Sequence, residues 1–372
     1  MRDLLFISGT RADYNKLTHI INFLSKSNKT TILLVDMHND RRFGDTGKVV
    51  INSVKDNPNI RVERIGRKNS ASTIKYYSWL TDKLEKYYSK RHFDMVFIHG
   101  DRMTAMASAI ASSFNNIPIC HIEAGDVSGS IDQNIRYAIT KFSHRFLVTN
   151  ADAAKRVIQV GEEEKSVFNI GNTSVIGIDR KDTNLNEEVE NFLGKNYAIL
   201  MYHSVTTDSF EDNRQNFAHV VNAMKSFDGK VLLIESNNDK YYESIQELYD
   251  TLPKDKFLIK KNLVPDHFYN ALLGCKFLIG NSSAGICEAP YLGVYSIDIG
   301  DRQSGRAYKE KSDSIFHIED RDEGLVELIH KVSKLKNPTH SIRSVKEFEK
   351  VLEGVFTEDF FNVDIEKKFI MR

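Results

Sequence analysis

The chain has 372 residues, 41% of them hydrophobic and 27% charged, and its 51 basic and 51 acidic residues give a formal net charge of zero. This length exceeds what one hydrophobic core usually supports, so the chain is predicted to be an ordinary globular protein of two domains. The balanced charge argues against a nucleic-acid or membrane surface as partner and leaves room for a local basic pocket that binds a small anion.

The cysteines and the apolar runs bear on the cellular compartment. Cys120, Cys275 and Cys287 are too few and too scattered for a disulfide framework, and they form no CxxC pair. The first apolar run, residues 4–8, is too short and too close to charged residues for a secretory segment. No uncharged apolar run approaches the roughly 18 residues that span a bilayer. We therefore expect a cytoplasmic protein.

Short apolar runs alternate with helical periodicity through the first half of the chain. Residues 17–24 carry apolar side chains at the spacing i, i+3, i+4, i+7 of an amphipathic helix. Strands are predicted at 4–8, 31–35, 93–98, 117–120, 145–148 and 167–170, with further helices at 72–88 and 104–114. This alternation is typical of a doubly wound α/β domain with a parallel sheet.

The same pattern returns after a polar interruption that begins near residue 172. Strands are predicted at 197–202, 230–234, 256–259, 275–279 and 295–299. We expect two Rossmann-like domains, 1–173 and 174–356, with their strand ends facing a central cleft, where ligands commonly bind. The remaining tail, 357–372, is expected to pack back on the N-terminal domain.

Acidic side chains follow two consecutive predicted strands of the first half. Asp101 and Glu123 lie just after these strands, and Asp132 follows a few residues later. Ligands of open parallel sheets bind outside the carboxyl ends of the strands, so we expect the three carboxylates to reach one place. Each alone could be a loop acid that caps a helix or pairs with an arginine. Three further polar residues are interleaved with them and favour a functional site: His99, Arg102 and His121.

A run of small residues, GNSSAG at 280–285, follows a predicted strand of the second half. Its backbone amides and the hydroxyls of Ser282 and Ser283 are suited to phosphate oxygens. Glu288, one turn into the next predicted helix, could accept hydrogen bonds from a ribose or could instead complement the helix dipole. The lysine of a GxxxxGK loop is missing, which argues against an NTP-hydrolysing P-loop.

Arginines and histidines at other strand ends complete the candidate set. Guanidinium groups at these positions are suited to a diphosphate, whereas a lone histidine after a strand is as readily structural as functional. The further substrate-binding candidates are Arg11, His38, Asn238, Arg302 and Arg306, and His203 is a further catalytic candidate.

Several cofactor and metal motifs are missing from the sequence. It has no HExxH, no Cys/His cluster and no calcium loop, so a protein-held metal is not expected. The lack of GxSxG argues against a serine hydrolase elbow, and the lack of GxGxxG argues against a nicotinamide enzyme. We expect no cofactor.

Six segments spread over most of the chain resemble the hydrolysing UDP-N-acetylglucosamine 2-epimerases, which include bacterial enzymes of sialic acid synthesis and the epimerase half of the bifunctional animal enzyme. The segments are GTRADYNKL, HGDR, HIEAGDVSGSID, RYAITKFSH, GNSSAGICEAP and DIGDRQSGR. The resemblance implies a GT-B fold, in which two Rossmann-like domains flank a cleft. It assigns catalysis to Asp101, Glu123, Asp132 and His203, and uridine diphosphate binding to Arg11, Arg102, Ser282, Ser283 and Glu288.

The implied reaction converts UDP-N-acetylglucosamine (UDP-GlcNAc) and water to N-acetylmannosamine (ManNAc) and UDP through 2-acetamidoglucal. Glu123 and Asp132 are provisionally assigned to proton transfer at C2 and C1, with Asp101 orienting or sharing the proton. His203 and the arginines would stabilise the leaving diphosphate. The residues do not decide which carboxylate serves which carbon.

Four alternatives stay open. The substrate could be a UDP-2,4-diacetamido-trideoxyhexose of a legionaminic-type pathway, and the protein could be a non-hydrolysing epimerase that returns an intact nucleotide sugar. It could instead be a GT-B glycosyltransferase, which would leave the C2 hydrogen in place, or a nucleotide-sugar binding module that releases no UDP. A homodimer is usual among similar proteins, and we expect one here.

Overall fold

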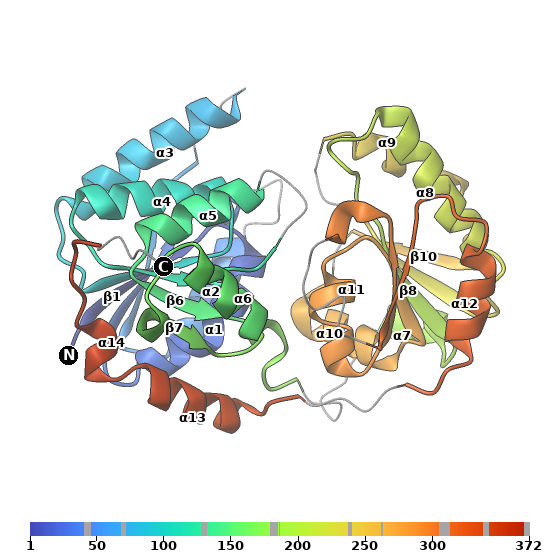
Figure 1. The fold of residues 1–372 in the computed structure, drawn as a ribbon. Helices are drawn as coiled ribbons and strands as arrows, with labels where there is room; N and C mark the ends of the chain where they lie inside the picture. Colours follow the sequence, from blue (N-terminus) through green and yellow to red (C-terminus); the bar gives the residue numbers. More distant parts are fainter. Residues whose placement is uncertain are drawn as a thin grey trace. The chain divides into compact units, whose positions relative to one another are not determined.

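The computed structural model describes residues 1–40, 46–67, 72–127, 132–178, 185, 187–236, 240–261, 263–304, 313–337 and 342–367. The chain divides into two compact units, one made of Met1–Ile176 with Ser344–Arg372 and one made of Gly177–Arg343. Each unit is a parallel sheet with helices on both faces (Figure 1). The predicted α/β class with two doubly wound sheets is therefore confirmed.

The first unit contains a seven-stranded sheet in the order β3-β2-β1-β4-β5-β6-β7. Its strands are β1 (Asp3–Ser8), β2 (Lys29–Leu34), β3 (Ile60–Arg64), β4 (Met95–His99), β5 (Ile119–Ile122), β6 (Arg145–Val148) and β7 (Val167–Asn169). The strand order reverses between β1 and β4, and ligands of such sheets bind at the carboxyl ends near this reversal. Asp101 and Glu123 follow β4 and β5, at that edge of the sheet.

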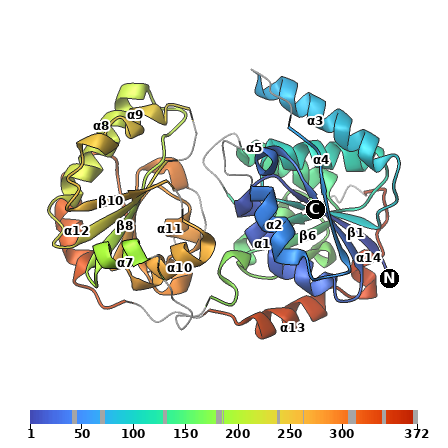
Figure 2. The same cartoon turned by 180° about the vertical axis from the view of Figure 1, so that it is seen from behind.

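Helices cover both faces of the first sheet (Figures 1 and 2). One face carries α1 (Arg11–Leu24), α2 (Thr46–Val54), α13 (Val345–Val355) and α14 (Glu358–Phe361), the other α3 (Thr73–Tyr88), α4 (Met103–Phe114) and α5 (Asp132–Phe142), while α6 (Ala151–Gln159) packs beside β6 and β7. Alternate residues of β1 point to opposite faces. Leu4 and Phe6 therefore join the core under α1, whereas Leu5 and Ile7 join the core under α3 and α4.

The second unit contains a six-stranded sheet in the order β10-β9-β8-β11-β12-β13. Its strands are β8 (Tyr197–Met201), β9 (Lys230–Ile234), β10 (Phe257–Lys260), β11 (Phe277–Gly280), β12 (Tyr295–Ile299) and β13 (Ile315–Ile318). Its helices are α7 (Glu187–Leu193), α8 (Phe210–Met224), α9 (Glu243–Gln246), α10 (Pro265–Gly274), α11 (Ala284–Cys287) and α12 (Leu325–Ser333). The strand order reverses between β8 and β11, so the loops that follow these strands hold the second candidate site.

The division of the chain differs from the expected one at its second boundary. The expected second domain, 174–356, includes α13, which the structure places in the first unit. Phe348, Leu352 and Val355 form the apolar stripe of α13 and are buried in the core that α1 covers. The described part of the expected tail, 357–372, belongs to the same unit. The chain therefore passes between the units twice, near residues 176 and 343.

Short 3₁₀ helices complete the connections at η1 (Asp36–Asn39), η3 (Glu164–Ser166), η4 (Thr173–Val175), η6 (Tyr249–Thr251), η7 (Pro290–Leu292) and η8 (Asp301–Gln303). Across the part of the chain that the structure describes, every helix is too short or too polar to cross a lipid bilayer.

Candidate active site

Glu123 occupies an unusual backbone position at the carboxyl end of β5. Its φ of 60° lies in the left-handed region, which side chains other than glycine adopt only where the surroundings enforce it. The Glu123 amide donates to the Leu147 carbonyl at 2.9 Å, and Arg136 Nη1 donates to the Glu123 carbonyl at 2.6 Å. Both the amide and the carbonyl of Glu123 are therefore hydrogen-bonded, one to the sheet and the other to α5, and together they fix the direction in which its side chain leaves the backbone.

The Glu123 carboxylate belongs to a buried chain of charged groups. Its Oε1 lies 2.7 Å from Lys16 Nζ, and its Oε2 lies 3.2 Å from His99 Nε2. The other ring nitrogen of His99, Nδ1, lies 3.2 Å from Asp13 Oδ1. Carboxylate oxygens only accept hydrogen bonds when ionised, so an imidazole between two of them is best satisfied as a cation. The result is an alternating row of charges from α1, β4 and the end of β5.

This arrangement shifts the pKa values of its members in opposite directions. Burial would raise the pKa of Glu123, but Lys16 and His99 outweigh it and hold that pKa well below its usual value. Burial would lower the pKa of His99, but Glu123 and Asp13 outweigh it and raise that pKa. In the same way His99 overcomes burial and lowers the pKa of Asp13. The site therefore favours an ionised Glu123 beside a protonated His99.

Asp101 and Asp132, the other two predicted acids, lie around two arginines. Asp101 forms an ion pair with Arg136 Nη2, and the same guanidinium binds the Glu123 carbonyl through Nη1. Asp132 is the first residue of α5. Burial would lower the pKa of Arg102, but the charges of Asp13, Asp101 and Asp132 raise it. The structure thus brings Asp101, Glu123 and Asp132 together with Arg102 in the first unit.

The other first-unit candidates differ in their accessibility. Arg11 is the first residue of α1 and is half-buried, and burial lowers its pKa. His38 is fully buried, with Nε2 2.8 Å from Ser8 Oγ and Nδ1 2.9 Å from Thr46 Oγ1. Burial lowers the pKa of His38 to about 4, so this histidine is neutral and both of its nitrogens have protein partners. Its predicted role in substrate binding stays a prediction.

In the second unit, Asn281 joins the loops that follow β8 and β11. Its Oδ1 accepts from the His203 amide at 2.7 Å, and its Nδ2 donates to the His203 carbonyl at 2.8 Å. Burial and the charge of Arg302 lower the pKa of His203 to about 3. His203 is therefore neutral, and it would offer a ligand a hydrogen bond rather than a positive charge.

The small-residue turn after β11 leads into a helix shorter than expected. Ser282 is buried and Ser283 is exposed, and the helix that follows, α11, has only four residues. Glu288 therefore lies just past the end of this helix rather than inside it, and Tyr269 OH donates to its Oε1 at 3.5 Å. Arg302 Nη1 donates to the Asn281 carbonyl at 3.2 Å, so its guanidinium lies beside the turn. Asn238 and Arg306 lie outside the described residues.

Three residues of the first-unit site are not among the sequence candidates: Asp13, Lys16 and Arg136. Asp13 caps the start of α1, where Thr10 and Asp13 form a capping box, and its second oxygen binds His99. Lys16 lies one turn further, at i+3, on the same side of the helix. The spacing Thr-x-x-Asp-x-x-Lys was a usable signal. Arg136 gave none, because its partners follow other strands.

Three exposed side chains of the second unit lie close enough together to bind one cation: Asp301, His317 and Glu319. Both nitrogens of His317 already lie 3.1 Å from carboxylate oxygens, those of Asp298 and Glu319. Exposed acidic groups are common without a bound metal ion, and the proposed chemistry gives this group no role.

Two doubly wound parallel sheets with polar groups at their carboxyl ends define an α/β protein of the GT-B class, and solved structures of this class share the fold. One is the Methanocaldococcus jannaschii UDP-GlcNAc 2-epimerase in complex with UDP-GlcNAc and UDP, with a TM-score of 0.75, 21% identity and coverage of 94% of this chain and 98% of that one. Another is the Neisseria meningitidis UDP-GlcNAc 2-epimerase bound to UDP-GlcNAc, with a TM-score of 0.76, 14% identity and coverage of 95% and 98%. At these identities the likeness shows the fold alone.

The family model described as UDP-N-acetylglucosamine 2-epimerase matches residues 23–350. A UDP-N-acetylglucosamine 2-epimerase of Neisseria meningitidis serogroup B is 33% identical, with 100% of this chain and 99% of the relative covered. The UDP-N,N'-diacetylbacillosamine 2-epimerase (hydrolyzing) of Legionella pneumophila is 27% identical over 86% of this chain and 85% of its own length. The chain therefore belongs to the UDP-N-acetylglucosamine 2-epimerase family, as its sequence motifs predicted.

Proposed function

We propose that the protein is a hydrolysing UDP-GlcNAc 2-epimerase, which converts UDP-GlcNAc and water to ManNAc and UDP. The observation that carries the proposal is the buried, ionised Glu123 beside His99, with Asp101 tied to the same peptide by Arg136. These ionisable side chains can take up or release a proton at a carbon or an oxygen atom of a sugar. The 33% identity to the Neisseria relative over the full chain supports the choice of substrate.

The chemistry must remove a hydrogen from C2 of a sugar that has no adjacent carbonyl to acidify it. Elimination solves this problem. The C2–H bond breaks and its proton passes to a carboxylate, while the C1–O bond breaks and UDP leaves with the bonding electron pair, which gives 2-acetamidoglucal. Water then adds at C1 and a proton returns to C2 from the opposite face, which gives ManNAc. The sum is one water consumed and one UDP released.

The first unit carries the proton-transfer groups of this proposal. Glu123 and Asp132 exchange protons at C2 and C1, and Asp101 orients or shares the proton. Glu123 is ionised in the free protein, so it is ready to accept a proton. Arg11 and Arg102 are the cations of this unit that would bind the diphosphate, and the charges of Asp13, Asp101 and Asp132 raise the pKa of Arg102.

The second unit carries the groups proposed to hold UDP. Ser282 and Ser283 would donate to phosphate oxygens, Arg302 would supply positive charge beside them, and Glu288 would accept from the ribose hydroxyls. His203 is neutral, so its proposed part in stabilising the leaving diphosphate is hydrogen bonding. Asn238 and Arg306 remain proposed binding residues from the sequence.

The substituents at C4 and C6 of the sugar define the second candidate function. The Legionella relative is named a UDP-N,N'-diacetylbacillosamine 2-epimerase. A relative from Campylobacter jejuni, 28% identical over 82% of this chain and 82% of its own length, is named for both the GDP and the UDP form of that sugar. A substrate of this kind would use the same groups at C1 and C2. Under either substrate the product would feed the synthesis of a sialic or related nonulosonic acid.

Side-by-side assays of the purified protein test the proposal. UDP-GlcNAc and the UDP-diacetamido sugar are offered separately, and the products are identified by NMR without added acceptor. We expect UDP and ManNAc from UDP-GlcNAc at the higher kcat/KM. A preference for the diacetamido sugar supports the second candidate, and an intact UDP-N-acetylmannosamine would show a non-hydrolysing epimerase. Release of no UDP from either sugar would contradict both hydrolytic proposals. Light scattering of the same preparation tests the expected homodimer.

A further inference from the structure

We propose that the C-terminal segment, residues 358–367, positions the catalytic groups of α5, with Lys367 as its main positioning residue. The inference rests on the proposed function, because it concerns the same carboxylates. It starts from three residues of α5, Asp132, Arg136 and Thr140, which are spaced i, i+4, i+8 and therefore share one side of the helix.

Two residues of this polar side of α5 contact the ends of β4 and β5. Arg136 binds Asp101 and the Glu123 carbonyl. Thr140 Oγ1 lies 3.1 Å from Nδ1 of His121, whose Nε2 donates to the Gly100 carbonyl at 2.8 Å. Burial lowers the pKa of His121 to about 3, so it serves here as a neutral bridge. A shift of α5 along its axis would therefore move the Arg136 guanidinium away from Asp101 and Glu123.

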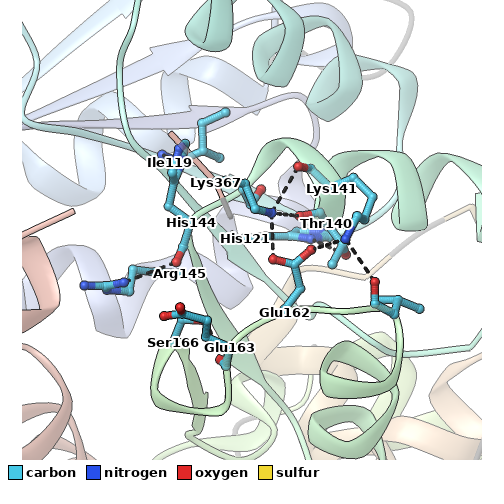
Figure 3. Close-up of polar contacts among 12 residues, drawn as sticks. Ile119, His121, Thr140, Lys141, His144, Arg145, Glu162, Glu163, Ser166 and Lys367 are labelled. Carbon is cyan, nitrogen blue, oxygen red and sulfur yellow. Dashed lines mark hydrogen bonds and ion pairs between the residues drawn. The ribbon is translucent and has the colours of Figure 1, made fainter. Parts of the chain in front are cut away.

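The opposite end of α5 is bound by the C-terminal segment (Figure 3). Lys367 Nζ donates to the Lys141 carbonyl at 3.0 Å and to the Thr140 carbonyl at 3.4 Å. These carbonyls belong to the last turn of the helix, where carbonyls have no partner within the helix and attract a cation through the helix dipole. The Thr140 carbonyl also accepts from the Ser143 amide at 3.1 Å. Lys367 thus caps α5 from a segment more than two hundred residues away in sequence.

A buried carboxylate fixes the position of Lys367. Glu162 is only 3% exposed, and its two oxygens lie 2.7 Å from Lys141 Nζ and 2.6 Å from Lys367 Nζ. Figure 3 shows Glu162 between the two lysine side chains. A buried charge is costly unless it is paired, so Glu162 holds both cations in place. The Lys367 side chain is 28% exposed.

The turn between α5 and β6 is bound by the same segment. Arg145 donates to three of its carbonyls, from Phe360 at 2.8 Å, Asp359 at 2.8 Å and Asn362 at 2.9 Å. His144 Nε2 lies 3.3 Å from the Ile365 carbonyl. Because the end of α5 and the start of β6 are both attached, the segment sets where the helix stops against the sheet.

Two substitutions in the full chain test the proposal: Lys367→Ala, and Lys367→Arg as a rescue that keeps the charge and the donors. Lys165→Ala is the matched control, because Lys165 pairs with Glu163 at 2.9 Å on the same unit and is 79% exposed. The readouts are kcat and KM with UDP-GlcNAc, and hydrogen exchange of the α5 amides measured by mass spectrometry.

We expect Lys367→Ala to lower kcat about tenfold with KM within about twofold, because small displacements of reacting groups reduce the rate strongly. It should also speed exchange in α5, and Lys367→Arg should restore most of both properties. Lys165→Ala should match the wild type. Unchanged kcat and unchanged exchange in Lys367→Ala would overturn the proposal while leaving the proposed function intact. If the wild type releases no UDP, the proposed function fails, and an unchanged α5 exchange rate would still reject the positioning role.

Discussion

His99 Nε2 lies 3.2 Å from Glu123 Oε2, at the carboxyl ends of two neighbouring strands of the first sheet. The contact couples a raised histidine pKa to a lowered glutamate pKa, so each group keeps the other charged. Because Asp13 binds the other nitrogen of His99, the imidazole cannot turn away without losing a buried partner. The pair therefore holds the carboxylate in one direction, as general base catalysis requires.

Neutralising the proposed proton-transfer groups tests their assignment. Glu123→Gln, Asp101→Asn and Asp132→Asn should each lower kcat by at least about 10², because each removes a carboxylate that the proposed chemistry needs. Steady-state release of UDP measures the effect. Glu163→Gln, at a half-buried position paired with Lys165, is the matched control and should keep full activity. Full activity in any of the three variants removes that residue from the mechanism.

Lys16 should set the acid limit of the pH–rate profile. Its ammonium lies 2.7 Å from Glu123 Oε1 and, together with His99, keeps the Glu123 pKa low. Lys16→Met removes that charge, so the pKa of Glu123 should rise and the acid limb of kcat/KM should move to higher pH. Lys155→Met, on the exposed surface of α6, should leave the profile in place. An acid limb that stays unchanged in Lys16→Met would show that Glu123 does not govern it.

The buried neutral histidines should make the protein sensitive to mild acid. The pKa of His38 is lowered to about 4 in the folded chain, against about 6.5 when unfolded. The unfolded state therefore binds more protons between these values. The contribution of neutral His38 to the free energy of unfolding is therefore complete above about pH 6.5. It is lost as the pH falls towards 4, by up to about 1.4 kcal/mol per pH unit.

Urea denaturation at pH 7 and pH 5 measures this loss. Wild type should have the lower midpoint at pH 5, and His38→Gln, which cannot take up the proton, should show a smaller difference between the two pH values. An equal difference in both proteins would assign the acid sensitivity to other groups.

Gly280 should tolerate no side chain at the start of the proposed phosphate turn. Its φ of +133° is open only to glycine, and an added Cβ would lie 2.0 Å from the Met201 carbonyl oxygen in β8. Gly280→Ala should therefore separate β11 from β8, lower the melting temperature and weaken UDP binding by calorimetry. Gly354→Ala in α13 is the control, since nothing lies within 4 Å of its added Cβ. A wild-type affinity for UDP in Gly280→Ala would argue against phosphate binding at this turn.

The buried strands were predictable because both faces of a parallel sheet are covered, which gives continuous apolar runs such as those of β4 and β5. The edge strand β3 was not predicted because Arg61 and Glu63 interrupt its apolar pattern. The edge strand β13 was also missed, although the residues of Ile315–Ile318 are mostly apolar. The boundary at residue 343 was also missed, since the apolar stripe of α13 does not reveal which core it joins. The carboxylates after β4 and β5 followed from topology. Arg136 gave no sequence signal because its partners follow other strands, whereas the spacing of Lys16 from Thr10 and Asp13 could have pointed to it.

Turnover of UDP-GlcNAc in D₂O, without acceptor and followed by NMR of the released sugar, tests the elimination and hydration chemistry most directly. We predict free UDP and ManNAc that carries one deuterium at C2, because the lost proton is replaced from solvent on the opposite face. A released sugar that retains protium at C2, or keeps the gluco configuration, would contradict it.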